Sequence, residues 1–149
     1  MSVRLSGPPP DARGSHVDTS KLRSCAQKVL EAVGQARSEL SLALIDDEQM
    51  QELNRRHRGI DRSTDVLSFS LLEGVSAAHR GRLLGDVVIG IETAARQASE
   101  RHRALDDEVA RLLIHGVLHL LGHDHEEPAE ARAMRAEERR VRRRLRDAR

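Results

Sequence analysis

The eleven residues from His115 to His125 read H-G-V-L-H-L-L-G-H-D-H and have the residue types and spacing of a metal site. On a helix, residues four apart lie on one face about 6 Å from each other, so His115 and His119 can offer two nitrogens to one ion. Gly122 can adopt the left-handed conformation that ends a helix and turns the chain back, which would bring in His125 as a third ligand. Three imidazoles with an open fourth position are typical of catalytic zinc.

Other uses of these histidines are less consistent with the composition. A structural zinc finger closes its coordination shell with four ligands, usually including thiolates, but the single cysteine, Cys25, is far away in sequence. Single histidines on a helix face are often structural, whereas three at this spacing favour a metal. His123 is expected to face solvent or substrate. Asp124 could either orient a ligand imidazole or stabilise the turn.

The residue after the first histidine is Gly116. The metalloprotease motif H-E-x-x-H-x-x-G-x-x-H has the same spacing but places a glutamate there as the general base. The metal scaffold is therefore present without the proteolytic base. Either the base lies elsewhere, or the substrate needs none of that kind.

Two further motifs accompany the histidines, T-D-V-L-S-F at residues 64–69 and L-G-D-V-V-I at residues 84–89. With the histidine segment, they closely resemble the YbeY family of bacterial metal-dependent endoribonucleases, over about residues 40–138 and in the family's order. The resemblance implies a zinc-dependent endoribonuclease that cleaves single-stranded RNA in 16S rRNA 3′-end maturation, ribosome quality control and ribosome biogenesis. The implied partners are an rRNA precursor and the ribosome or its small subunit.

The resemblance also implies site residues. One Zn²⁺ per chain would be held by His115, His119 and His125, and Arg58 would be the catalytic arginine. Zinc bound by neutral imidazoles lowers the pKa of its water, and a forked guanidinium matches the charge that develops during phosphodiester cleavage. Asp65 and Asp86 are interpreted as structural residues that anchor loops.

Two alternatives to this interpretation remain open. The chain could be a non-catalytic zinc-containing ribosome-assembly factor that uses the metal and its arginines only to dock. A metallopeptidase-like hydrolase is less favoured because no general base is evident.

Composition limits the functions further. The formal net charge is +1, but residues 126–149 hold nine arginines against six acids, so the C-terminal end is the basic end. Its arginine run is either a solvated helix face or a phosphate-binding patch. With one phenylalanine and no tyrosine or tryptophan, base stacking is nearly unavailable, so arginine and metal must recognise RNA.

Location is inferred from cysteine content and hydropathy. A single cysteine fits a reducing cytoplasm. Residues 1–13 lack the apolar run of a signal peptide, and the most apolar stretch, residues 112–121, contains two histidines. We therefore expect a cytoplasmic protein without membrane contact.

The hydrophobic patterns predict an α/β (α+β) fold in one metal-dependent hydrolase domain, residues 1–149. About four strands (residues 3–5, 40–45, 66–70 and 83–89) should form one mixed sheet, with a polar loop around residues 74–81. About five helices should pack on it, with the zinc-binding helix central and buried because it is apolar nearly all round. Residues 1–17 are expected to be partly mobile and residues 139–149 to form an arginine-rich helical C-terminus. Glu138 is predicted to be structural, pairing with an arginine.

Overall fold

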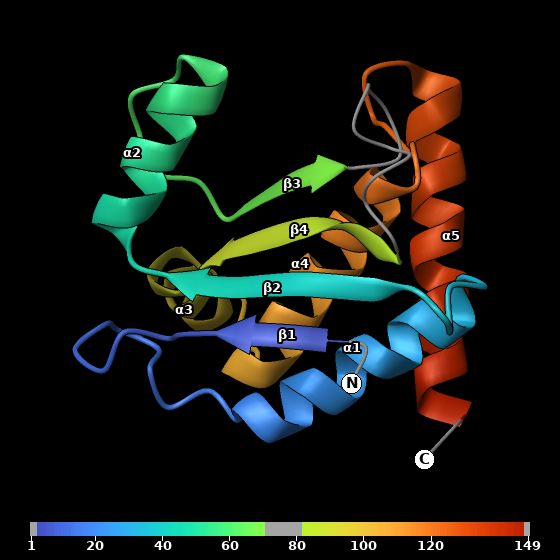
Figure 1. Ribbon diagram of the computed structural model, residues 1–149, viewed down its shortest axis with the longest axis horizontal. Helices are drawn as coiled ribbons and strands as arrows, with labels where there is room; N and C mark the ends of the chain where they lie inside the picture. Colours follow the sequence, from blue (N-terminus) through green and yellow to red (C-terminus); the bar gives the residue numbers. More distant parts are fainter. Residues whose placement is uncertain (1–2, 71–81, 148–149) are drawn as a thin grey trace.

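The computed structural model describes residues 3–70 and 82–147, which contain four strands and five helices. In chain order these are β1 (Val3–Ser6), α1 (Thr19–Ala32), β2 (Glu39–Ile45), α2 (Asp47–Arg58), β3 (Val66–Ser70), β4 (Leu83–Gly90), α3 (Ile91–Glu100), α4 (Leu105–Leu120) and α5 (Pro128–Asp147) (Figure 1). The predicted α/β class and element count are confirmed. The predicted loop at residues 74–81 and the last two residues of the predicted C-terminal helix lie outside the described residues.

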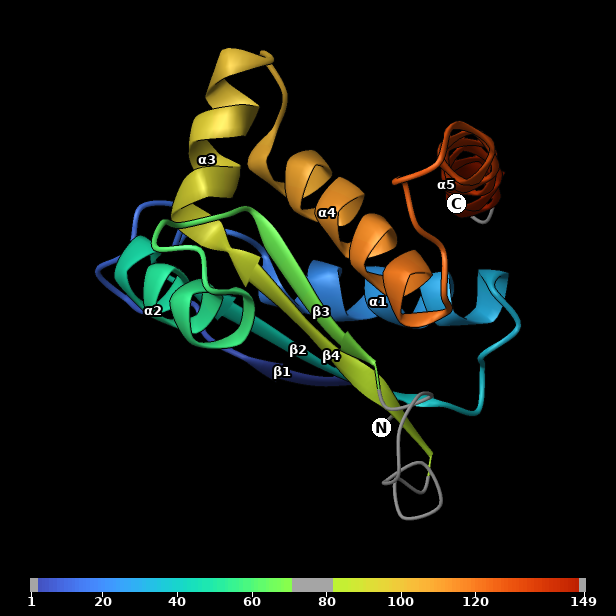
Figure 2. The same cartoon turned by 90° about the horizontal axis from the view of Figure 1, so that it is seen from above.

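The four strands form one mixed sheet in the order β1-β2-β4-β3. The β1–β2 and β2–β4 pairs are parallel, and β3 pairs antiparallel with β4. Helices α1 and α4 lie on one face of this sheet and α2 lies on the other, while α5 packs outside α1 and α4 (Figure 2). The sheet and α4 together carry most of the hydrophobic core.

Capping chemistry sets the start of α2 and the end of α4. Asp46 and Gln49 form a reciprocal capping box at the start of α2, in which each side chain accepts a hydrogen bond from the other's backbone N–H. Helix α4 stops at Leu120, and Gly122 follows with a φ of 95°, in the left-handed region. The turn predicted at Gly122 is therefore present, and it directs the chain toward His125.

Helix α4 approaches the sheet closely at Gly116. A Cβ atom at this position would lie 2.7 Å from Cγ1 of Val87 on β4 and 3.2 Å from Oγ of Ser68 on β3. Two hydroxyls of β3 reinforce the contact, because Ser68 donates to the Gly116 carbonyl at 2.9 Å and Ser70 donates to the Leu120 carbonyl at 3.0 Å. The helix predicted to carry the metal ligands is central and buried, as expected.

One buried charge on α4 was not predicted. Glu108 is completely buried and accepts hydrogen bonds from Arg111 at 2.8 Å and from Arg101 at 3.4 Å. Hydrogen bonding to Arg111 lowers the pKa of Glu108 below its ordinary value, so the carboxylate remains charged. The ion pairs compensate the cost of burying this charge at the first turn of the helix.

In the described residues, no helix combines the length and the apolar character needed to cross a membrane.

Candidate metal centre

The structure brings together the three predicted metal ligands. His115 and His119 project from the last turns of α4, and His125 follows the Gly122 turn, so that one ligand atom from each lies within 4.8 Å of the others. The Nε2 atoms of His115 and His119 are 3.1 Å apart. The ring centroids of these two residues lie 5.9 Å and 5.4 Å from that of His125. His123 does not belong to this cluster.

The geometry and protonation of the cluster fit a transition-metal ion. Nitrogens bound tetrahedrally to zinc at about 2.05 Å are roughly 3.3 Å from one another, close to the observed His115–His119 separation. Burial, with a smaller contribution from the neighbouring histidines, lowers the pKa of His119 and favours the neutral imidazole that a metal requires. The residues present can therefore hold a metal ion.

Glu138 of α5 orients the His115 ring. Its Oε1 atom lies 3.1 Å from Nδ1 of His115, which leaves the Nε2 atom of that ring facing His119. This hydrogen bond is the main cause of the lowered pKa of Glu138. The carboxylate also lies 3.6 Å from Arg142, so the predicted arginine partner is present as well.

The sequence analysis missed the contact between Glu138 and His115. Glu138 lies four residues after the buried Met134, on the inner stripe of α5, and its side chain is only 15% exposed. The signal available in the sequence was an acidic residue on the otherwise apolar inner stripe of this helix. The sequence did not show which other helix Glu138 would contact.

The histidine cluster opens into a cavity of ≈ 580 Å³ that also contains Arg58. Its walls are residues 64–68 and Ser70 from the β3 segment, together with Asp124 and Glu126 beyond α4. Arg58 is exposed and projects from the last turn of α2. The predicted catalytic and metal-binding residues therefore share one cavity, although they come from helices on opposite faces of the sheet.

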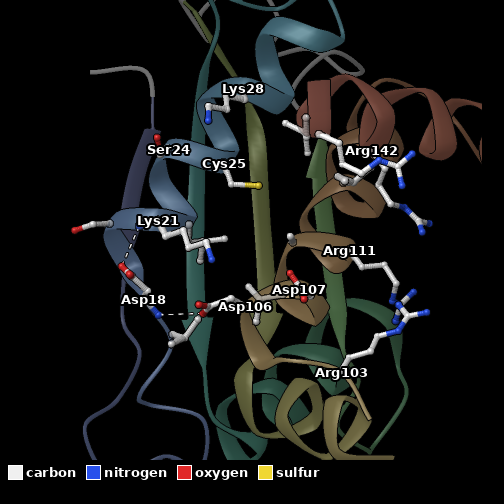
Figure 3. Close-up of a pocket in the computed structure, with 18 residues that line it drawn as sticks. Asp18, Lys21, Ser24, Cys25, Lys28, Arg103, Asp106, Asp107, Arg111 and Arg142 are labelled. Carbon is white, nitrogen blue, oxygen red and sulfur yellow. Dashed lines mark hydrogen bonds between the residues drawn. The ribbon is translucent and has the colours of Figure 1, made fainter. Parts of the chain in front are cut away.

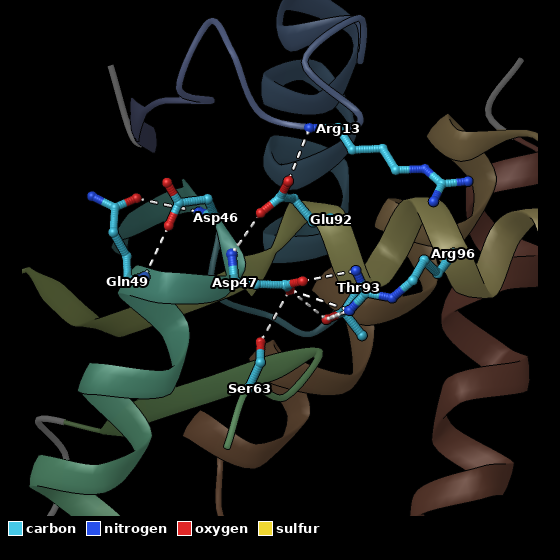
Figure 4. Close-up of polar contacts among 8 residues, drawn as sticks. All are labelled: Arg13, Asp46, Asp47, Gln49, Ser63, Glu92, Thr93 and Arg96. Carbon is cyan, nitrogen blue, oxygen red and sulfur yellow. Dashed lines mark hydrogen bonds and ion pairs between the residues drawn. The ribbon is translucent and has the colours of Figure 1, made fainter. Parts of the chain in front are cut away.

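A network centred on Asp47 fixes the helix that carries Arg58 (Figure 4). The Asp47 carboxylate accepts hydrogen bonds from Ser63, Thr93 and Arg96, the last at 2.7 Å, and its backbone N–H donates to Glu92. The Arg96 guanidinium is the main cause of the lowered pKa of Asp47. Both the start of α2 and the segment that follows it are thus tied to α3.

Two other acidic residues near the cavity make local contacts. The Asp65 carboxylate accepts a hydrogen bond from Gln97 at 3.3 Å, and its backbone carbonyl accepts from Gly90. Asp124 accepts from the His125 backbone N–H at 2.7 Å, whereas its carboxylate is 3.9 Å from the His125 ring. Asp124 therefore stabilises the turn and does not hydrogen-bond to the His125 imidazole.

A second cavity, of ≈ 550 Å³, lies among α1, α4 and α5 (Figure 3). Cys25, Lys21 and Arg142 are among its lining residues, and none of the three clustered histidines reaches it. It is therefore separate from the candidate metal centre.

Comparison with known proteins identifies the family. A sequence model described as "Endoribonuclease YbeY" matches residues 11–146. The chain belongs to the endoribonuclease YbeY family. An endoribonuclease YbeY from Anaeromyxobacter sp. (strain Fw109-5) is 48% identical over 138 residues, which cover 93% of this chain and 69% of the relative. One from Aquifex aeolicus (strain VF5) is 44% identical over 114 residues, covering 76% of this chain and 74% of the relative.

A solved structure agrees with this assignment. The solution structure of TM1509 from Thermotoga maritima superposes with a TM-score of 0.60 at 25% sequence identity, covering 98% of this chain and 93% of that chain. The predicted resemblance to YbeY and the predicted fold class are both confirmed.

Metal binding is expected to need all three clustered histidines. His115→Ala, His119→Ala and His125→Ala should each lose the metal, whereas His123→Ala should retain one ion per chain, since its ring lies outside the cluster. Metal analysis of the four purified variants checks this. Loss in His123→Ala equal to that in the others would show that the ligand set is wrong.

Glu138→Gln is expected to weaken metal affinity about 10- to 100-fold, because the carboxylate orients the His115 ring and increases its basicity. Glu137→Gln is the matched control, since the adjacent Glu137 pairs with Arg140. Competition with a chelator measures both affinities. Equal affinities for the two variants would show that the contact between Glu138 and His115 does not support the metal.

Proposed function

We propose that this chain is a zinc-dependent endoribonuclease that cleaves single-stranded RNA. The observation that carries the proposal is the shared cavity, in which Arg58 and three convergent imidazoles line the same space. The names of the YbeY relatives support RNA as the substrate. We further propose that the substrate is an rRNA precursor in the cytoplasm, that the cleavage serves 16S rRNA 3′-end maturation and ribosome quality control, and that the small subunit is a partner.

The proposed metal is one Zn²⁺ held by His115, His119 and His125. Three nitrogen donors with a fourth position open to the cavity are the donor set typical of catalytic zinc. When bound, the ion would lower the pKa of a coordinated water and polarise a phosphoryl oxygen. The chain's own contribution is to orient the imidazoles, and the Glu138 carboxylate does this for His115 by accepting a hydrogen bond from its Nδ1 atom.

Arg58 is proposed to bind the scissile phosphate. A guanidinium is permanently charged, and its forked donors match two phosphate oxygens at once. Cleavage adds negative charge to these oxygens, so a fixed cation stabilises the transition state more than the ground state. The Asp47 network holds α2 against α3 and thereby limits the movement of the helix that carries Arg58.

The packing at Gly116 argues against peptide hydrolysis. The carboxylate of a zinc protease would start from this position, but even a Cβ would come within 2.7 Å of Val87. A glutamate side chain there would require Val87 or α4 to shift from its present position. RNA cleavage does not need a glutamate at this position, because a metal held by the three histidines would itself supply the activation of the attacking group.

Arg58→Ala is expected to fold and bind zinc normally but to cleave RNA about thirtyfold to a thousandfold more slowly, a loss of roughly 2–4 kcal/mol of transition-state stabilisation. Arg58→Lys should recover part of the rate, because a point charge cannot reproduce the fork. Arg56→Ala, on the same turn but not lining this cavity, is the control in single-turnover assays. Unchanged cleavage by Arg58→Ala would remove this residue from the site.

A single preparation of the wild-type protein is expected to cleave single-stranded RNA and to leave peptides intact. A chelator should abolish the RNA cleavage. Fluorogenic RNA and peptide substrates measure the two activities side by side. The His119→Ala protein, purified in parallel, controls for contaminating ribonuclease. Equal RNA cleavage by the wild type and this control would contradict the proposed enzymatic activity and would favour a non-catalytic assembly factor.

A further inference from the structure

Helix α5 carries a line of five arginines that the proposed catalytic site does not use. They are Arg132, Arg135, Arg139, Arg143 and Arg146, called here the arginine ridge, and all five are exposed. Successive members are three or four residues apart, so they lie on one side of the helix and span about 21 Å along its axis. Figure 1 shows α5 as a straight helix at the edge of the molecule.

Ion pairs within the chain do not account for this arrangement. Within residues 3–70 and 82–147, no carboxylate lies within ion-pair distance of any ridge arginine, whereas the neighbouring Arg140 and Arg142 pair with Glu137 and Glu138. Like charges three and four residues apart repel each other. Arg132 and Arg135 also lie far from the last turn, where a cation would interact favourably with the helix dipole. The ridge is thus an uncompensated line of positive charge.

We propose that the arginine ridge is a second RNA-binding surface, which holds the phosphodiester backbone of the strand whose cleavage is proposed above. The ridge has the charge and length to contact several phosphates, and α5 begins at Pro128, three residues after the metal-ligand candidate His125. A strand leaving the metal cavity past His125 would meet the ridge at Arg132.

Other anionic partners fit the ridge less well. An amphipathic helix that lies on a membrane must insert its apolar face, but the corresponding residues of α5, Met134 and Val141, are 1% and 0% exposed in the core. An acidic protein would need an apolar anchor at the centre of its interface. The exposed residues between ridge arginines include Ala133 and Ala136, which offer no such anchor.

Salt-dependent RNA binding tests the ridge independently of catalysis. The probe is a fluorescent single-stranded oligouridylate, titrated with full-length protein carrying His119→Ala so that binding is measured without cleavage. R139Q/R143Q removes two ridge charges, and R13Q/R37Q removes two exposed charges elsewhere as the matched control. R139K/R143K keeps the charge, and circular dichroism checks that each variant is folded.

Each lost phosphate contact should reduce the magnitude of the slope of log K against log salt by about 0.7. We therefore expect R139Q/R143Q to reduce this magnitude by about 1.4. The affinity for RNA in 0.1 M salt should fall by about 25-fold. R13Q/R37Q should change the RNA affinity less than about twofold, because it removes no ridge charge. R139K/R143K should also change it less than about twofold, because it keeps the charge that releases counterions. Equal losses in R139Q/R143Q and R13Q/R37Q, or no loss in R139Q/R143Q, would overturn the proposal. Displacement of the RNA by polyglutamate, or binding to phosphatidylserine vesicles that R139Q/R143Q abolishes, would also overturn it. Absence of RNA cleavage by the wild type would contradict the proposed catalysis and leave this binding result unaffected.

Discussion

The close packing of α4 against β3 and β4 is the constraint on which the site depends. Gly116 lets the helix approach Val87, and the hydroxyls of Ser68 and Ser70 bind helix carbonyls on either side of His119. Interiors packed at this density resist local movement. Two imidazoles one turn apart on such a helix are therefore held at a fixed separation, as a preorganised metal site requires.

The rest of the site is assembled around that helix from both sides of the sheet. The Gly122 turn brings His125 back to the end of α4, and α2, on the opposite face, carries Arg58 into the same cavity. Helix α5 closes the arrangement from outside, where Glu138 reaches His115. Helix α2 is held by its capping box and the Asp47 network, and α4 is held by its contacts with β3.

The sequence was sufficient for features that depend on local chemistry. The histidine spacing and Gly122 predicted the histidine cluster, and the apolar patterns predicted the strands to within a few residues and the number of helices. Features that depend on tertiary contacts could not be predicted in this way. Glu138 was assigned an arginine partner because its helix neighbours are visible in the sequence, whereas His115 lies on another helix. The burial of Glu108 and the contact between Gly116 and Val87 likewise arise when distant segments pack together.

The central claim is that one zinc ion, held by three histidines beside Arg58, makes this chain cleave RNA. The most direct measurement is the initial rate of RNA cleavage as zinc is titrated into metal-stripped protein. The account predicts no cleavage without metal and a linear rise that stops at one zinc per chain. A cleavage rate that does not depend on zinc would contradict the account. So would a rise that stops at a different number of zinc ions per chain, or no cleavage at saturating zinc.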